Sequence, residues 1–399
     1  MPRQQTSTSL RWSCVYLLSF LLTSLLGGCA NNQQYDAING TASTPNTTAD
    51  STHGYKPGDT IAVLLPQRGQ YAGAARAVRD GLLTAQREID ESERPRLVFY
   101  DNSNAENTER TLQRAAADGA RLAIGPLQKA AVNRLAVTPA LPIATLALNS
   151  PQGDALPPEN LYRFALDPED EAKEVARAAR GKGFSSALII YPDSAWGMRI
   201  ARAFMGRWTA LGGVIEAGQH YNRETYDLAE PLDKLFQTAQ YATTATGWNT
   251  KADFIFLVGT AREAQEIWPQ IRQRVADQLP VFCTSHIYDG SFAALQRQGL
   301  GGLYFVDIPW MIAPLRDGSA ALNGIRSGPR SSDSDYQRLF AMGLDAYRLA
   351  PIIAQTPNHK NPVLDGQTGV LSIDGLRRVR RQLPLVRIGS KGLSIQTQP

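Results

Sequence analysis

The chain has 399 residues, of which 43% are hydrophobic and 20% are charged, and this balance excludes wholesale disorder. With 41 basic and 37 acidic residues, the formal net charge is +4, and it becomes +2 when the first 28 residues, with Arg3 and Arg11, are removed. A chain so near neutrality lacks the basic surplus of nucleic-acid-binding proteins, so no nucleic-acid partner is predicted.

The first 28 residues are predicted to be an export signal. Two arginines precede Trp12–Leu26, an apolar run that is shorter than the roughly 20 residues needed to span a bilayer. The run ends in Leu26-Gly-Gly-Cys29, which resembles a lipobox, the motif at which a lipoprotein signal is cleaved ahead of an acylated cysteine. The alternative is an ordinary cleaved signal followed by a chance cysteine.

Cys29 is the predicted lipidation site. Ala30 follows it, at the place where lipoproteins retained in the inner membrane carry aspartate, so the sequence points to an outer-membrane lipid anchor on the periplasmic side. Several acyl chains hold a protein stably, whereas one chain alone binds weakly. Removal of Cys14 with the signal leaves Cys283 as the one free thiol, which excludes an internal disulfide. Cys283 is predicted to be a small buried residue.

Residues 29–59 are predicted to form a flexible, lipidated tether. They are rich in Asn, Gln, Thr, Ser and Ala and show no periodic apolar face. An extended chain of about 28 residues reaches about 90 Å, so the folded part can stand off the membrane.

From residue 60 onward, short apolar runs alternate with helical patterns. Runs that are apolar on both faces are typical of parallel strands covered by helices on each side. The predicted strands are 61–65, 96–100, 122–124, 143–146, 187–191 and 254–258, and the predicted helices are 72–89, 108–118, 169–182, 195–211, 228–240 and 261–275. This alternation predicts an α/β fold with right-handed βαβ units and doubly wound parallel sheets.

The alternation breaks near 161–168 and near 285–290, which predicts two lobes within residues 60–390, joined by about three crossovers. Lobe 1 is expected to hold about 60–165 and 285–358, including a strand at 303–306 and a long helix at 334–353. Lobe 2 is expected to hold about 166–284 and 359–390, where 369–375 and 383–388 are predicted to pair as antiparallel strands.

The motifs of common catalytic and metal sites are absent from the sequence. Its four histidines form no pair at ligand spacing, and it contains no nucleophile elbow, phosphate-binding loop or dinucleotide-binding glycine motif. No serine is followed three residues later by lysine, which excludes the serine-acylating enzymes of the cell wall. We therefore predict no catalytic residue, no metal and no cofactor, and we expect that the protein is not an enzyme.

Several polar residues have both a functional and a structural interpretation. The acidic run Asp167 to Glu171 could contain a catalytic pair, but its place at a helix start favours capping and the helix dipole. His286, near a proposed crossing, could be a general base or a structural histidine. Ligands of open α/β sheets lie beyond the carboxyl ends of the strands, although turns and caps also place polar residues there. The candidate cleft residues are Tyr288, at the proposed crossing, and five residues at these strand ends: Gln67, Arg68, Tyr71, Asn149 and Trp196.

Short motifs in order along the chain resemble two related families. Ile61–Pro66, Gly69–Ala72 and Ala77–Gly81 resemble the opening of type I periplasmic binding proteins of the branched-chain amino-acid class. A further set resembles the LpoA/LppC-type family of outer-membrane lipoproteins, which activate a class A penicillin-binding protein: Ile124–Leu127, Leu166–Ala172, Tyr191–Gly197, Arg207–Gly213, Thr284–Tyr288, Asp307–Trp310 and Gly343–Tyr347. The resemblance covers roughly 60–389 and implies a bilobal fold like that of type I periplasmic binding proteins.

The sequence departs from both families in one respect each. Longer members of the LpoA/LppC-type family carry a helical-repeat domain ahead of this region, where this chain has the predicted tether. Solute binders hold an amino acid with small hydroxyl residues after the third strand, and this sequence has Leu127, Gln128 and Lys129 there.

The resemblance implies a regulator: an outer-membrane lipoprotein that binds and activates a class A penicillin-binding protein, a peptidoglycan synthase, and so regulates peptidoglycan synthesis. Trp310 is a candidate residue of the partner surface because interface hot spots favour tryptophan, and core packing is its alternative role. The competing hypothesis is a periplasmic solute-binding receptor for a small molecule such as an amino acid or a wall fragment.

Overall fold

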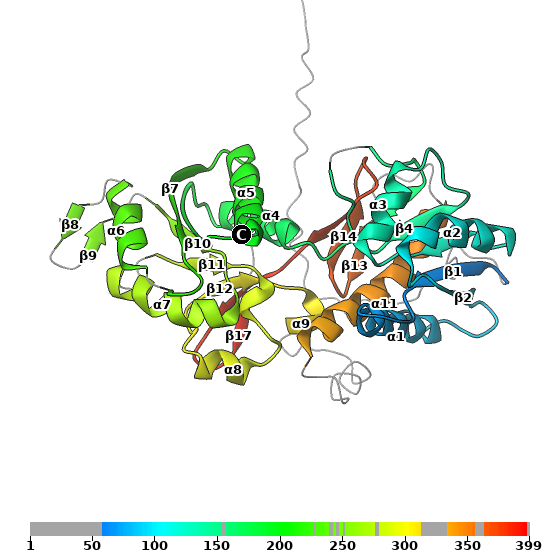
Figure 1. The fold of residues 1–399 in the computed structure, drawn as a ribbon. Helices are drawn as coiled ribbons and strands as arrows, with labels where there is room; N and C mark the ends of the chain where they lie inside the picture. The colour runs from blue at the N-terminus through cyan, green and yellow to red at the C-terminus, as the bar shows by residue number, and fades with distance from the viewer. Residues whose placement is uncertain are drawn as a thin grey trace, which may run out of the picture. The chain divides into compact units, whose positions relative to one another are not determined.

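The computed structural model describes residues 58–153, 156–226, 228–238, 242–244, 247–249, 252–275, 279–312, 333–355 and 363–396. The first part of the chain contains β1 (Thr60–Leu65), α1 (Ala72–Arg87), β2 (Arg96–Asp101), η1 (Ala105–Asn107), α2 (Thr108–Ala117), β3 (Leu122–Ile124), α3 (Lys129–Val137), β4 (Ala144–Ala147) and β5 (Leu161–Arg163). The middle part contains α4 (Pro168–Gly181), β6 (Ser186–Pro192), α5 (Ala195–Ala210), β7 (Val214–Tyr221), α6 (Ala229–Thr238), β8 (Ala242–Thr244), β9 (Gly247–Asn249), β10 (Phe254–Leu257), α7 (Ala261–Val275), β11 (Val281–Cys283), η2 (Ser285–Ile287), α8 (Phe292–Arg297) and β12 (Tyr304–Val306). The last part contains α9 (Pro309–Ile312), α11 (Ser334–Gln355), β13 (Val363–Gly366), β14 (Gly369–Ile373), β15 (Val379–Gln382), β16 (Leu385–Ile388) and β17 (Leu393–Gln396) (Figure 1).

The first sheet has five parallel strands in the order β2-β1-β3-β4-β5. Side chains of β1 alternate between two buried clusters, because successive strand residues point to opposite faces. Val63 belongs to the cluster that contains Val78 of α1, whereas Leu64 belongs to the cluster that contains Leu112 of α2. Helices therefore cover both faces of this sheet, as the doubly apolar strands predicted.

The second sheet has seven strands in the order β17-β16-β12-β11-β10-β6-β7, and β16 and β17 run antiparallel to their neighbours. Aromatic side chains fill its core: Phe254 meets Trp208 edge-on with ring centroids 5.2 Å apart, and Phe256 stacks on Phe204 at 4.3 Å. Because β12 pairs with β11, the prediction that residues 285–306 belong to lobe 1 is wrong. The irregular stretch at 285–290 is a loop within the second lobe, not a crossing.

Three further strands form a small antiparallel sheet in the order β13-β14-β15. The predicted pairing of 369–375 with 383–388 is wrong, because β14 pairs with β15 while β16 pairs with β12 and β17. The partner was hidden because β15 reads Val379-Arg-Arg-Gln382, which has no apolar alternation. Residues 363–382, which were expected in lobe 2, thus lie outside both large sheets.

Helices α1 and α11 pack closely through a pair of glycines. A Cβ atom on Gly81 would lie 2.1 Å from the carbonyl oxygen of Phe340, and one on Gly343 would lie 2.2 Å from that of Val78. No other residue fits either position without moving a backbone, so this contact fixes α11 against the first lobe.

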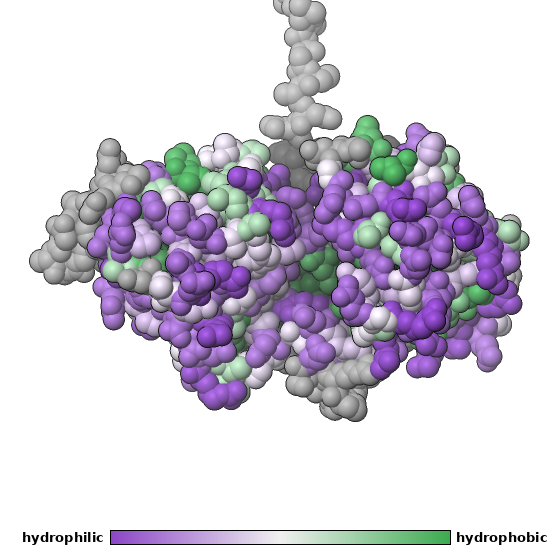
Figure 2. Space-filling view, viewed as in Figure 1, coloured by the Kyte–Doolittle hydropathy of each residue, from purple (hydrophilic) through white to green (hydrophobic). Residues whose placement is uncertain are grey.

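The chain passes between the two large sheets three times: after β5, after β12 through α9 and α11, and after β15. The predicted α/β fold, with two doubly wound parallel sheets joined by about three crossovers, is confirmed. Figure 2 shows that the visible face is largely hydrophilic. Within the described ranges, no helix combines the length and the apolar character that crossing a membrane requires.

Candidate functional site

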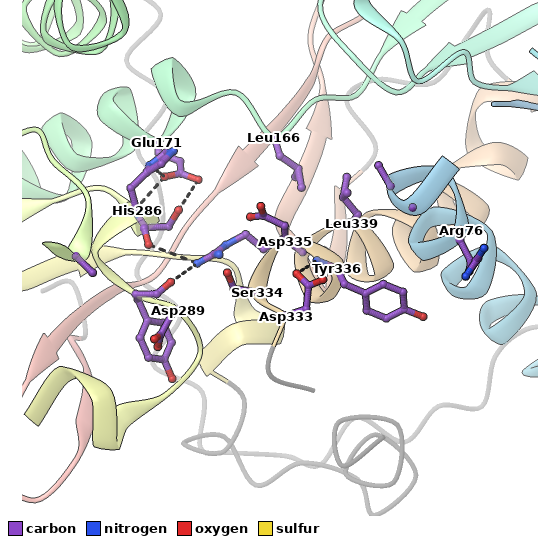
Figure 3. A pocket seen from close by; sticks show the side chains of 16 residues that line it. Arg76, Leu166, Glu171, His286, Asp289, Asp333, Ser334, Asp335, Tyr336 and Leu339 are labelled. Atoms are coloured by element: carbon purple, nitrogen blue, oxygen red, sulfur yellow. Dashed lines mark hydrogen bonds and ion pairs between the residues drawn. The ribbon is translucent and has the colours of Figure 1, made fainter. Parts of the chain in front are cut away.

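A cavity of about 700 Å³ lies between the lobes, bounded by α1, α4, α11 and the segment that follows β11. Figure 3 shows Glu171 and His286 on one side of it and Arg76 and Tyr336 on the other. The residues that line it are Gly73, Ala74, Arg76, Leu166, Glu171, Ala261, Ser285, His286, Tyr288, Asp289, Asp333, Ser334, Asp335, Tyr336, Arg338 and Leu339. It lies beyond the carboxyl end of β11, where open α/β sheets bind ligands.

Glu171, in the first turn of α4, is buried and its carboxylate is fully engaged. The backbone nitrogen and the hydroxyl of Ser285 each donate a hydrogen bond to it, both at 3.0 Å. His286 places its Nδ1 3.8 Å from the same carboxylate and 3.1 Å from the hydroxyl of Thr284. Because the backbone nitrogen and the hydroxyl of Ser285 both bind this carboxylate, Glu171 fixes the segment after β11 to α4. The arrangement is therefore structural.

Arg338 of α11, which is partly buried, forms an ion pair with the fully buried Asp307, which directly follows β12. The guanidinium Nη2 lies 2.7 Å from the Asp307 carboxylate and also donates to the carbonyl oxygen of Tyr288 at 3.0 Å. Burial alone lowers the pKa of Arg338, but the adjacent carboxylate of Asp307 raises it above its ordinary value. Because α11 packs on the first lobe and β12 belongs to the second, this pair ties the two lobes together.

The cavity rim is acidic but is not a metal site. Asp333 accepts a hydrogen bond from the backbone nitrogen of Tyr336 at 3.0 Å, and Asp289 accepts one from that of Ser291 at 2.8 Å. Among the residues that the structure describes, no group of three or more His, Cys, Asp or Glu side chains could hold a metal ion.

The structure brings two of the six predicted cleft residues to this cavity. Tyr288 lines it. Trp196 lies beside it, edge-on to His286 with ring centroids 5.2 Å apart.

The other four predicted cleft residues do not line this cavity. Arg68, whose side chain is 83% exposed, pairs with Asp101 at 2.9 Å, and Tyr71 is exposed. The backbone nitrogen of Gln67 donates to the hydroxyl of Ser103 at 3.0 Å. Asn149 donates its side-chain amide to the carbonyl oxygen of Leu127 at 3.0 Å. The first-lobe residues are therefore turn and surface residues, and the prediction that all six form one seat is wrong.

The prediction that Trp310 is an exposed anchor is also wrong. Its side chain is 1% exposed, its indole nitrogen donates to Gln337 at 2.7 Å, and its ring packs on Phe340 at a centroid distance of 5.3 Å. Trp310 belongs to the junction of α9 and α11, as in the alternative of core packing. Cys29 lies outside the described residues.

The sequence interpretation missed Arg338 and underestimated Glu171. Glu171 was assigned to the helix dipole with the other acids of its run, yet it alone among them is buried. Its place one helical turn after Asp167, on the apolar face of α4 with Ala172 and Val175, was the available signal. Arg338 gave no local signal, because its partner lies 31 residues earlier and is brought to it only by the chain crossing.

Comparisons with known proteins place the chain among lipoproteins of one family. The family model for LppC lipoproteins matches residues 53–389. The chain is 27% identical over 358 residues to the penicillin-binding protein activator LpoA of Vibrio antiquarius, which covers 84% of this chain and 58% of that protein. It is 30% identical over 320 residues to LpoA of Erwinia tasmaniensis, and this match covers 72% of this chain and 46% of that protein. The chain thus spans about half the length of the curated relatives it matches.

Solved structures support the same fold. The C-domain of LpoA from Haemophilus influenzae, described as a regulator of PBP1A, has a TM-score of 0.69 at 23% identity and covers 85% of this chain and all of that one. A branched-chain amino acid ABC transporter protein from Chromobacterium violaceum has a TM-score of 0.65 at 29% identity. The match covers 82% of this chain and 99% of that one. The region shared with these proteins is the bilobal α/β fold itself.

Proposed function

The chain belongs to the LppC lipoprotein family, and on this premise we propose that it binds a class A penicillin-binding protein and activates peptidoglycan synthesis. The observation that carries the proposal is the family match over residues 53–389, which includes both lobes and the small sheet. Relatives that bear the activator name match 84% and 72% of this chain. Activation is then a property of a folded surface and requires no reactive side chain.

The chemistry of the inter-lobe cavity supports a regulator over a solute receptor. Glu171 and Arg338, which line it, are engaged by Ser285 and by Asp307, so neither is left to bind an amino acid's ammonium or carboxylate. After β3, where solute binders hold the ligand with small hydroxyls, Leu127 and Gln128 are buried, and Gln128 donates to the carbonyl oxygen of Ser103 at 3.2 Å. A charged ligand placed there would remain unpaired, which is costly.

A regulator of this kind needs only to bind the active state of the synthase more tightly than the inactive state. A hundredfold preference corresponds to about 2.7 kcal/mol and shifts the conformational equilibrium by the same factor. An interface of ordinary size can supply this difference through a few well-packed residues.

The same proposal includes the anchor. We infer that Cys29 is acylated and that the lipid holds the protein at the periplasmic side of the outer membrane, as the lipobox and Ala30 suggest. Metabolic labelling with palmitate should mark the wild-type chain, whereas Cys29→Ser should remain unlabelled and leave the outer-membrane fraction. Equal labelling of both chains would contradict this anchor.

The decisive experiment is cross-linking in a purified synthase assay. The soluble chain that begins after Cys29 should be retained on an immobilised class A synthase and should raise its rate of peptidoglycan cross-linking. If it neither binds nor stimulates any class A synthase of the same organism, the activator proposal fails.

The cavity of about 700 Å³ is large enough for a small solute, which is the observation behind the receptor alternative. A thermal-shift screen tests this alternative. A solute at a hundred times its Kd stabilises its receptor by about 2.7 kcal/mol, or several degrees in Tm. Amino acids and soluble muropeptides should leave the Tm unchanged. A clear increase with one of them would favour the receptor.

A further inference from the structure

Arginines outnumber acids at the hairpin that joins β14 to β15. Asp374 is the acid of this turn, and its Oδ2 accepts a hydrogen bond from Arg378 at 3.0 Å and from Arg380 at 2.8 Å. One carboxylate thus binds two guanidinium groups, and Arg380 also lies 3.9 Å from the carboxylate of Asp170. The neighbouring arginines, Arg163 of β5 and Arg377 of the turn, add two more positive charges.

Arg163 and Arg377 have no carboxylate partner among the described residues. Arg163 donates through Nη2 to the carbonyl oxygen of Leu376, and its Nε is buried without a hydrogen bond. Burial lowers the pKa of Arg163 from its ordinary value, and the positive charge of Arg378 lowers it further. The side chain of Arg377 makes no hydrogen bond or ion pair with any residue that the structure describes. This end of the hairpin therefore carries a surplus of positive charge.

Arg381 adds an uncompensated charge directly behind this surface. Its side chain is only 6% exposed, and none of its three guanidinium nitrogens has a hydrogen-bond partner. Asp170 is close enough to interact electrostatically, but its carboxylate is engaged by Lys173 at 2.6 Å. A buried charge is weakly screened, so it adds to the positive potential of the exposed face.

Exposed apolar side chains accompany these arginines. Val363 and Arg380 both pair with Ser372, so the two lie on one face of the small sheet. Val370 shares that face with its partner Asp365, an exposed acid at the end of the face away from the hairpin tip. Val363 and Val370 are exposed, as is Leu376 at the hairpin tip, which is 44% exposed. Arginine set among exposed apolar groups is the composition of protein interfaces, which favour arginine and exclude water around apolar contacts.

We propose that the arginine hairpin, defined as Arg163, Val370, Leu376, Arg377, Arg378 and Arg380, docks an acidic protein segment of the penicillin-binding protein. This inference rests on the proposed function and names the contact surface for it. Charge complementarity selects an acidic partner. We choose a protein segment over a lipid surface because arginine enriched beside exposed apolar side chains is the composition of protein interfaces.

The position of the hairpin suits a regulatory contact. The backbone nitrogen of Arg163 donates to the carbonyl oxygen of Arg377 at 2.9 Å, which joins the hairpin to the first sheet. The backbone nitrogen of Leu383, just after β15, donates to Glu174 of α4 at 3.0 Å, which joins it to the second lobe. A segment docked here contacts the junction of both lobes.

The test is binding to an immobilised, full-length class A synthase from the same organism, measured by interferometry at low and at physiological salt. Arg377→Glu should weaken binding at least about tenfold, since like charges repel across the interface. Wild-type affinity should fall as salt rises. Arg377→Asn removes the charge with a side chain that tolerates the positive φ of 57°, so it keeps the fold and should also weaken binding.

Arg110→Glu is the matched control, because Arg110 is an exposed arginine on α2 with no bond to a described residue. It makes the same change in net charge and should bind like the wild type. Equal binding by the wild type and both Arg377 variants overturns the inference, as does an equal loss in the control. If the Arg377 variants bind the synthase like the wild type but lose the wild type's binding to vesicles of phosphatidylethanolamine and phosphatidylglycerol, the hairpin is a membrane contact instead, and the inference is overturned. If the wild type fails to bind any synthase, the proposed function falls first.

Discussion

The ion pair of Arg338 and the buried Asp307 makes a sharp prediction at the scale of single residues. Arg338→Leu leaves the Asp307 carboxylate buried without its counter-charge, and breaking such a pair costs about 3–5 kcal/mol. The double variant with Asp307→Leu removes both charges and should recover most of that loss. Urea unfolding of the soluble chain measures both. If the double variant is as unstable as the single one, the pair is not the origin of the effect.

The hydrogen bond from Ser103 makes a second prediction at this scale. It is the largest of several interactions that together lower the pKa of Asp101 to about 2 from the ordinary 3.8. A carboxyl group with a lowered pKa stabilises the fold above about pH 4, and that contribution is lost as the pH falls toward 2. Ser103→Ala should raise the pKa toward its ordinary value in an NMR titration, and Arg68→Ala should raise it less. The opposite order would contradict this assignment.

The role of a residue was predictable from the sequence where its neighbours along the chain determine it. It was not predictable where the fold brings in a partner that is distant in sequence. Tyr288 was placed at the cleft because it lies in the stretch 285–290, the proposed crossing; that stretch is a loop, yet Tyr288 lines the cavity. Trp310 was placed at the surface because nothing local reveals Gln337, 27 residues later, as its hydrogen-bond partner. Candidate site residues from loops therefore need the tertiary fold.

Helix packing carries the prediction at the scale of elements. Gly343→Ala would place a Cβ atom 2.2 Å from the carbonyl oxygen of Val78, so α1 and α11 must separate. Overpacking costs about 1–3 kcal/mol and should exceed the gain of about 1 kcal/mol in helix propensity. Gly206→Ala in α5 is the matched control, because its Cβ meets nothing within 4 Å, and it should stabilise the fold. A stabilised Gly343→Ala variant, measured by thermal unfolding, would contradict the close contact.

Helices and strands were predictable where their sequence shows a clear pattern of apolar, buried residues. The strands that are apolar on both faces, such as β1 and β10, lie at the predicted residues. β7 and β15 escaped prediction because polar side chains interrupt them: β7 is an edge strand, and β15 holds arginines that face solvent or remain buried without a partner. The arginine-rich segment 377–381 is visible in the sequence, and it lies at the surface proposed above for docking.

For the whole molecule, the order of strands and helices along the chain does not decide which lobe each later segment joins. A break in the strand-helix pattern can be a crossing, as at 161–168, or a long loop within one lobe, as at 285–290, and both look alike in sequence. β12 decides the second case because it pairs with β11. The two lobes and three crossings were therefore predictable, and the membership of the later segments was not.

The continuity of the core predicts how the whole fold unfolds. One buried cluster contains Val78 of the first lobe, Phe340 of α11 and Phe254 of the second lobe, so no boundary in the core separates the lobes. Chains beyond about 150 residues often unfold in steps, but a shared core makes each lobe depend on the other. Calorimetry of the soluble chain should show one transition whose van't Hoff enthalpy equals its calorimetric enthalpy. Two resolved transitions would mean that the lobes fold independently, and the Arg338 variant should then lower only one of them.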